Sequence, residues 1–203
     1  MLIAAELDIN ETYERTSLLC LQVLEVKTCS LYSFDKNFYY NKKWWHVIEC
    51  LLRNGVDVDK IILNGDSALN LACSLFNKCY RTMLIETLLR EKADINISNS
   101  KYQTALIYNC LTGAEIYKLV AYKADLGAVD NLGRSVLHVA VCADNVSIVE
   151  ALLECYIDTS IQNKEDNTTR FYLDCVNTTK CSDSIKSKVQ ILQLFDKRKL
   201  ENN

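Results

Sequence analysis

The side chains most able to do chemistry in this sequence are ten cysteines and two histidines. The histidines, His46 and His138, are far apart in sequence, and no two cysteines form a Cys-x-x-Cys pair, so the short paired spacing of zinc ligands is missing. Several cysteines fall inside apolar runs, where a thiol acts as a small hydrophobic side chain. The sequence therefore predicts reduced cysteines with a packing role, no metal site and no cofactor.

Motifs for catalysis and phosphate binding are also missing. Carboxylates do not cluster with nucleophiles, and the five glycines form neither a Gly-x-Gly-x-x-Gly nor a P-loop string. A lone histidine such as His138 is expected to make a backbone hydrogen bond rather than to act as a general base. We therefore expect no catalytic residues and no enzymatic activity.

Composition limits the kinds of partner and the cellular location that can be expected. The chain has 203 residues, 49% hydrophobic and 24% charged, with a net charge of -3, which suits one domain or one run of repeats. The acidic balance argues against nucleic acid as a partner, and no apolar run is long enough to span a membrane. Glu6 brings charge in too early for a signal peptide. A cytoplasmic protein is expected, and the basic run 197–199 is a weak signal for nuclear targeting.

The sequence repeats itself about every 33 residues. Each copy has a short apolar segment followed by a second one, and the first segments are Gly65-Asp-Ser-Ala-Leu-Asn-Leu-Ala72, Gln103-Thr-Ala-Leu-Ile-Tyr108 and Gly133-Arg-Ser-Val-Leu-His-Val-Ala140. The spacing of Leu137, Ala140 and Val141 is helical, as is that of Ile148, Val149, Leu152 and Leu153. Ser67, Thr104 and Ser135 precede the first helices as hydroxyl caps.

This unit resembles the ankyrin repeat, in which Gly-x-Thr-Pro-Leu-His-x-Ala is followed by a helix ending in paired leucines and by Gly-Ala-Asp. The chain departs from that pattern at the proline, because Ser17, Ala68, Ala105, Val136 and Arg170 occupy its position. The resemblance implies an all-α solenoid of helix-turn-helix units with β-turn or hairpin fingers. It also implies a non-enzymatic scaffold that binds another protein along a concave face.

On this interpretation the whole chain is one ankyrin-repeat domain. The predicted parts are a partial repeat at 1–10, a repeat at 11–59 with an aromatic insert at 22–44, repeats at 60–96, 97–128 and 129–161, and a degenerate capping repeat at 162–203. The insert is expected to be a loop between two helices. It either folds as a lid over the N-terminal end or binds a partner through its aromatic side chains.

A finer resemblance concerns Gly133-Arg-Ser-Val-Leu-His-Val-Ala-Val141, Asn145, Val149 and Leu152-Leu-Glu-Cys155, which are similar to a late repeat of the I-kappa-B family. It implies an inhibitor of Rel/NF-kappa-B transcription factors, without the N-terminal Asp-Ser-Gly-x-x-Ser degron of the signal-regulated members. The alternatives are a substrate-recognition adaptor and a poxvirus-like host-interaction factor. The proline-containing C-terminal box of the adaptors is missing, since the chain has no proline.

Turn tips and first-helix residues are the predicted partner-binding positions, because they are expected to line one edge without a packing role. They are Asn64, Asp66, Lys101, Tyr102, Gln103, Leu132, Arg134, Asp144 and Asn145. Charge reversal at Arg134 together with Lys101 is expected to weaken binding without lowering the melting temperature.

Overall fold

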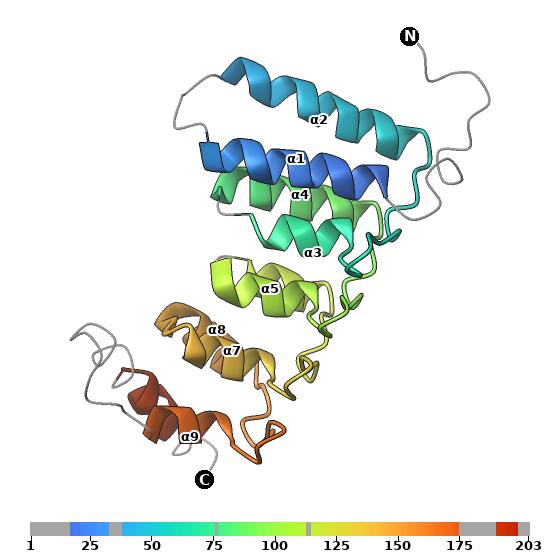
Figure 1. Cartoon of the computed structure of the whole chain (residues 1–203). Helices are drawn as coiled ribbons and strands as arrows, with labels where there is room; N and C mark the ends of the chain where they lie inside the picture. Colours follow the sequence, from blue (N-terminus) through green and yellow to red (C-terminus); the bar gives the residue numbers. More distant parts are fainter. Residues whose placement is uncertain (1–16, 33–37, 76, 113–114, 175–189, 199–203) are drawn as a thin grey trace. The chain divides into compact units, whose positions relative to one another are not determined.

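The computed structural model describes residues 17–32, 38–75, 77–112, 115–174 and 190–198 (Figure 1). Apart from two isolated antiparallel bridges, Val129 with Ser135 and Gln162 with Thr168, the regular structure of these residues is helical. This confirms the predicted all-α class. The chain divides into two compact units, Met1–Ser100 and Lys101–Asn203, and each is described by itself. The repeat boundaries within one continuous array stay a prediction.

The described part of unit 1 contains the helices α1 (Leu18–Tyr32), α2 (Phe38–Arg53), α3 (Ala68–Cys73) and α4 (Lys78–Arg90). Helix α1 packs against both α2 and α3, and α3 packs against α4. Side chains such as Leu19, Leu69 and Leu88 are almost completely buried between them. Each helical pair thus covers its apolar surface with the neighbouring pair as well as internally, as repeat architectures require.

The predicted insert at 22–44 is not a loop over most of its length. Residues 22–32 continue α1, and residues 38–44 form the start of α2. Residues 18–32 and 38–53 contain neither glycine nor proline, so neither of these helix-breaking residues interrupts α1 or α2. The expectation of a loop is therefore wrong there. Residues 33–37 of the insert lie outside the described residues, as does the predicted partial repeat at 1–10, so the expected lid over the N-terminal end stays a prediction.

The described part of unit 2 contains the helices α5 (Ala105–Thr112), α6 (Ile116–Ala121), α7 (Val136–Cys142), α8 (Val146–Glu154) and α9 (Thr169–Asp174), and residues 190–198 are also helical. Helix α5 packs against α6 and α7, α7 packs against α8 and α9, and α6 packs against α8. The helix at 190–198 buries Ile191 and Phe195 and exposes the charged Asp196. This pattern is typical of a capping element, with one apolar and one charged face.

Polar side chains cap several helix starts. Ser67 Oγ accepts the Asn70 N–H at 3.2 Å, and Ser135 forms a capping box with His138 at the start of α7. The cap predictions at Ser67 and Ser135 are confirmed. That at Thr104 is wrong, because its buried Oγ1 has no hydrogen-bond partner among the described residues.

Helices α2, α4, α6 and α8 are each followed by a residue with left-handed backbone geometry. Glycine has this role only at the end of α2, where Gly55 has φ +73°. Non-glycine residues occupy the corresponding position after α4, α6 and α8, namely Lys92 (φ 64°), Lys123 (φ 65°) and Tyr156 (φ 58°). A side chain at such a position costs roughly 1–2 kcal/mol, because its Cβ crowds the following carbonyl oxygen.

Replacing Lys123 with glycine is therefore expected to stabilise unit 2. Relief of the left-handed strain exceeds the entropy that glycine adds to the unfolded chain, leaving a gain of about 0.5–1 kcal/mol. Urea denaturation followed by circular dichroism measures the gain. Lys123→Ala is the matched control, since alanine keeps the Cβ and its strain. Equal midpoints for the two variants would contradict this explanation.

The cysteines differ in their surroundings. Cys20, Cys73 and Cys110 are buried and reduced, which confirms the predicted packing role for these three. Burial raises the pKa of the Cys20 thiol to about 11 and so keeps it protonated. Cys50, Cys79 and Cys142 are exposed instead, and for them the packing prediction is wrong. They lie on the outward side of their helices, which the apolar runs around them did not indicate.

Candidate functional site

The loops that connect one helical pair to the next form short fingers, at residues 57–66 in unit 1 and at 125–134 and 158–167 in unit 2. The segment 94–103 corresponds to them and contains the junction of the two units. Each finger begins with an aspartate that accepts the backbone N–H two residues further on. These distances are 3.0 Å from Asp57 to Asp59 N, 2.8 Å from Asp125 to Gly127 N and 2.8 Å from Asp158 to Ser160 N. Such Asx turns fix the direction in which the chain enters the finger.

A second polar side chain closes each finger of unit 2. Asp130 Oδ1 accepts the N–H groups of Leu132 at 2.9 Å and Arg134 at 3.0 Å. In the next finger Asn163 Oδ1 bonds in the same way to Glu165 N and Asn167 N, at 2.9 and 3.0 Å. Both side chains are buried, so the tips are held from inside.

Neighbouring fingers are joined through their backbones. In unit 2 Asn131 N–H donates to Lys101 O at 2.9 Å and Lys164 N–H donates to Leu132 O at 3.0 Å, and in unit 1 Ser100 N–H donates to Asn64 O at 2.9 Å. The backbones approach so closely that a Cβ on Gly133 would lie 2.9 Å from Lys164 N. Within each unit the fingers therefore form a row with a fixed spacing.

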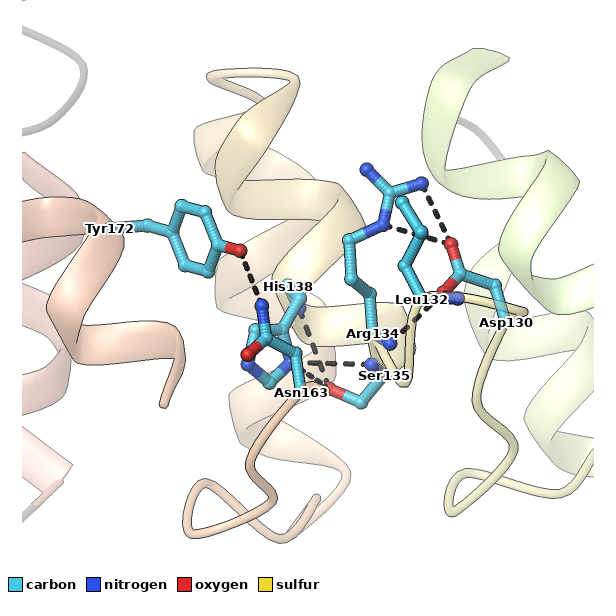
Figure 2. A network of polar contacts seen from close by, with 7 residues as sticks. All are labelled: Asp130, Leu132, Arg134, Ser135, His138, Asn163 and Tyr172. Carbon is cyan, nitrogen blue, oxygen red and sulfur yellow. Dashed lines mark hydrogen bonds and ion pairs between the residues drawn. The ribbon is translucent and has the colours of Figure 1, made fainter. Parts of the chain in front are cut away.

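His138 links α7 to the following finger through Asn167, and Figure 2 shows its ring bonded to Ser135 at the start of α7. Its Nε2–H donates to Asn167 O at 3.1 Å, and its Nδ1 lies 3.2 Å from Ser135 N and 2.7 Å from Ser135 Oγ. Because the Ser135 amide can only donate, Nδ1 is the acceptor and the ring is neutral with its proton on Nε2. The predicted backbone hydrogen bond of His138 is confirmed.

The surroundings of His138 disfavour its charged form. Burial lowers its pKa below the ordinary 6.5, and the nearby Arg134 cation acts in the same direction, against the Asn167 carbonyl and Asp130, which raise it. The ring also meets Tyr172 of α9 edge to face, with centroids 5.8 Å apart, and Tyr172 Oη accepts Asn163 Nδ2–H at 2.6 Å. This histidine is a junction between repeats, not an acid-base group in a cleft.

Asn70 has the corresponding role in unit 1. It stands three residues after the capping serine of α3, as His138 does in α7, and it is fully buried. Its Nδ2–H donates to Ile97 O in the following segment at 3.1 Å. The sequence reasoning missed Asn70, although its position in the repeat was a usable signal. It also missed Asp130, Asn163 and Tyr172, whose partners are known only from the fold.

Arg134 forms an ion pair with Asp130, which changes the expected effect of charge reversal at Arg134. Its Nη2 and Nε lie 2.7 and 2.8 Å from Asp130 Oδ2, and the Asp130 side chain is completely buried. Charge reversal at Arg134 would place a second carboxylate against this buried one and lower stability. The expectation that reversal leaves the melting temperature unchanged is therefore wrong, and Arg134 is unsuitable as a probe of binding alone.

The other predicted binding residues differ in exposure. Asn64, Lys101 and Tyr102 are exposed, Leu132 is half exposed, and Gln103, Asp144 and Asn145 are partly buried. Asp66 is buried and accepts hydrogen bonds from Asn64 Nδ2 at 2.7 Å and Asn99 Nδ2 at 3.0 Å. Asn145 Oδ1 caps α8 through Ile148 N. The expectation that these positions carry no packing role is wrong for Asp66 and Asn145.

Large apolar side chains are exposed at the finger tips. Leu63 of unit 1 is 82% exposed, and in unit 2 Tyr102 is 64% and Leu132 50% exposed. The polar groups beneath them are paired, whereas these side chains face solvent from a backbone that hydrogen bonds hold in place. Rigidly presented apolar and aromatic groups are typical anchors of protein-protein interfaces.

The described part of the chain contains neither a metal-binding cluster nor a membrane-spanning helix. No three His, Cys, Asp or Glu side chains there come together as a metal site would require. None of the described helices combines the length and apolar character needed to cross a membrane.

Comparison with known proteins identifies the repeat. A family model for ankyrin repeats, in three copies, matches residues 76–163. The chain is 28% identical over 174 residues to ankyrin repeat protein L92 of Acanthamoeba polyphaga mimivirus, covering 64% of this chain and 42% of the relative. It is 31% identical over 133 residues to ankyrin repeat protein FPV031 of fowlpox virus (strain NVSL), covering 61% of this chain and 38% of the relative.

The chain thus spans less than half the length of either of these viral relatives. Their similarity agrees with the geometry of unit 2, where capped helical pairs alternate with fingers joined by backbone hydrogen bonds. Ankyrin repeats act as modules that bind other proteins. Residues 76–163 of this chain therefore consist of ankyrin repeats.

Proposed function

We propose that this chain binds a partner protein along its finger tips, with Tyr102 and Leu132 as the main anchors in unit 2. The observation that carries the proposal is the exposure of these apolar side chains on a finger row that backbone hydrogen bonds hold in place. A rigid row loses little entropy on binding, so more of the contact energy remains as affinity. In unit 1, Leu63 would serve in the same way.

The partner we propose is a host protein, because both matched relatives belong to viruses. A Rel/NF-kappa-B transcription factor is one candidate, through the resemblance of residues 133–141 to the I-kappa-B family. Three residues of that stretch have roles in folding. Gly133 allows the backbones of two fingers to approach closely, Ser135 caps α7, and His138 bonds to the next repeat. Their presence is explained by the fold, so they do not by themselves favour a Rel partner.

Truncating the two anchors is expected to weaken partner binding strongly. In the double variant Tyr102→Ser, Leu132→Ser, affinity should fall by at least about tenfold, because anchors at the centre of an interface dominate its energy. The backbone groups of Leu132 that bond to Asp130 and Lys164 remain in place. The measurement compares capture of cellular proteins from lysate by the wild type and the variant, followed by titration of the captured protein in purified form.

Tyr122→Ser is the matched control, because Tyr122 is also half exposed but follows α6 and lies outside the fingers. It should bind as the wild type does. Equal loss in the control and the double variant would place the binding surface elsewhere. A purified Rel-family transcription factor forms a separate arm of the titration. Binding that the anchor substitutions abolish would favour the I-kappa-B interpretation, and no binding would exclude it.

A further inference from the structure

The sequence contains two Asn-Gly pairs, Asn54-Gly55 and Asn64-Gly65. In such a pair the glycine amide nitrogen can attack Cγ of the asparagine side chain, because glycine offers little steric hindrance. A C–N bond forms in a five-membered imide, and the side-chain nitrogen leaves as ammonia. Water then opens either imide carbonyl and gives aspartate or isoaspartate. The reaction needs only water, so the local structure decides which pair reacts.

At Asn64 the structure opposes ring closure. The carboxamide is held at both ends, since Nδ2 donates to Asp66 Oδ2 at 2.7 Å and Oδ1 accepts Asp66 N–H at 3.1 Å. The attacking nitrogen, Gly65 N, already donates to Ile62 O at 2.8 Å, and a Cβ on Gly65 would lie 2.9 Å from Ser100 N. The imide can form only after this finger opens.

At Asn54 the described hydrogen bonds hold only one end of the carboxamide. Asn54 is exposed and lies directly after the last residue of α2, Arg53. Both described hydrogen bonds of its carboxamide are made by Nδ2, to Cys50 O at 2.7 Å and to Cys50 Sγ at 3.5 Å. Gly55 N donates to Leu52 O at the longer distance of 3.2 Å, and a Cβ on Gly55 would meet no atom within 4 Å.

We propose that Asn54 is a site of spontaneous deamidation in the folded chain and that its finger protects Asn64. Conversion has a structural consequence, because the Asn54 Nδ2–H that bonds to the Cys50 carbonyl is replaced by a negatively charged oxygen. A negative charge at a helix C-terminus is unfavourable, because the carbonyl dipoles of the last turn already place partial negative charge there. Deamidation therefore loosens the last turn of α2, immediately before the finger at 57–66.

Peptide mapping of the purified full chain tests the proposal. Trypsin separates the two sites, because cleavage after Arg53, Lys60 and Lys78 gives the peptides 54–60 and 61–78. After incubation of the folded chain at mildly alkaline pH, we expect aspartate and isoaspartate in peptide 54–60 roughly ten times faster than in peptide 61–78, since protection follows local opening. In denaturant the two rates should become similar.

A folded chain in which Asn54 converts no faster than Asn64 would overturn the proposal. Asp66→Ala provides a further test, because it removes the carboxylate that accepts Asn64 Nδ2–H, while the backbone N–H of residue 66 can still bond to Asn64 Oδ1. It should raise the rate at Asn64 and leave that at Asn54 unchanged, whereas general unfolding would raise both. No change at Asn64 would contradict the protective role of this finger.

The consequence for α2 is measured on substituted chains. Asn54→Asp should lower the thermal midpoint more than Asn54→Ala, because both lose the bond to Cys50 O but only the aspartate adds charge at the helix end. Equal midpoints for these two variants would contradict the loosening of the last turn.

Discussion

Replacing Gly133 with alanine is expected to lower the free energy of unfolding by about 3 kcal/mol. Two costs add. The backbone at Gly133 has φ +73°, where any side chain is strained, and the new Cβ would lie 2.9 Å from Lys164 N and 3.2 Å from Asn163 C. These are backbone atoms of the next finger, which cannot move without stretching the hydrogen bond from Lys164 N to Leu132 O. Urea denaturation measures the loss.

Alanine substitutions at two other glycines distinguish the cost of backbone strain from the cost of the close contact between fingers. Gly127 lies in the same finger without a positive φ, and its nearest contact is the Asp125 side chain at 3.3 Å, so Gly127→Ala should change stability by less than about 0.5 kcal/mol. Gly55 has φ +73°, but a Cβ there would have no atom within 4 Å, so Gly55→Ala should cost only about 1 kcal/mol. If Gly133→Ala costs no more than Gly55→Ala, the close approach of the fingers has no energetic weight.

Replacing His138 with leucine is the second large effect, an expected loss of about 2–4 kcal/mol. Leucine fills the buried site but cannot bond to Asn167 O or to Ser135 N–H. Asn167 O then keeps only its bond to Asn163 N–H, and the side-chain link between the two repeats is lost. His138→Gln should cost less, because its amide can still donate to Asn167 O. A leucine variant as stable as the wild type would show that the hydrogen bonds of His138 do not stabilise the junction.

The lowered pKa of His138 also predicts that the free energy of unfolding depends on pH. Its pKa is below 6.5 in the folded chain, so below about pH 6.5 the unfolded chain binds a proton that the folded chain does not. Stability contributed by this group is therefore present above pH 6.5 and falls as the pH decreases from there. In His138→Gln this part of the slope should disappear. An unchanged slope in that variant would assign the pH dependence to other groups.

The sequence predicted the repeat because its signals are local. Helical spacing around Leu137, a hydroxyl cap at Ser135 and a lone histidine at His138 depend on nearest neighbours and were interpreted correctly. The insert was misjudged because the repeat pattern implied a helix length, whereas a segment free of glycine and proline continued α1 and α2. Likewise, exposed Cys142 sits in an apolar run that suggested burial.

The sequence by itself determined the fold class and the alternation of helical pairs and fingers, since periodicity and capping act within a few residues along the chain. Only the tertiary structure decided which finger residues remain available to a partner. Asp66 is buried by bonds to Asn64 and Asn99, and Arg134 is held by Asp130, while Tyr102 and Leu132 stay exposed. The physical reason is that burial and pairing depend on the neighbouring repeat, whose approach no local pattern specifies.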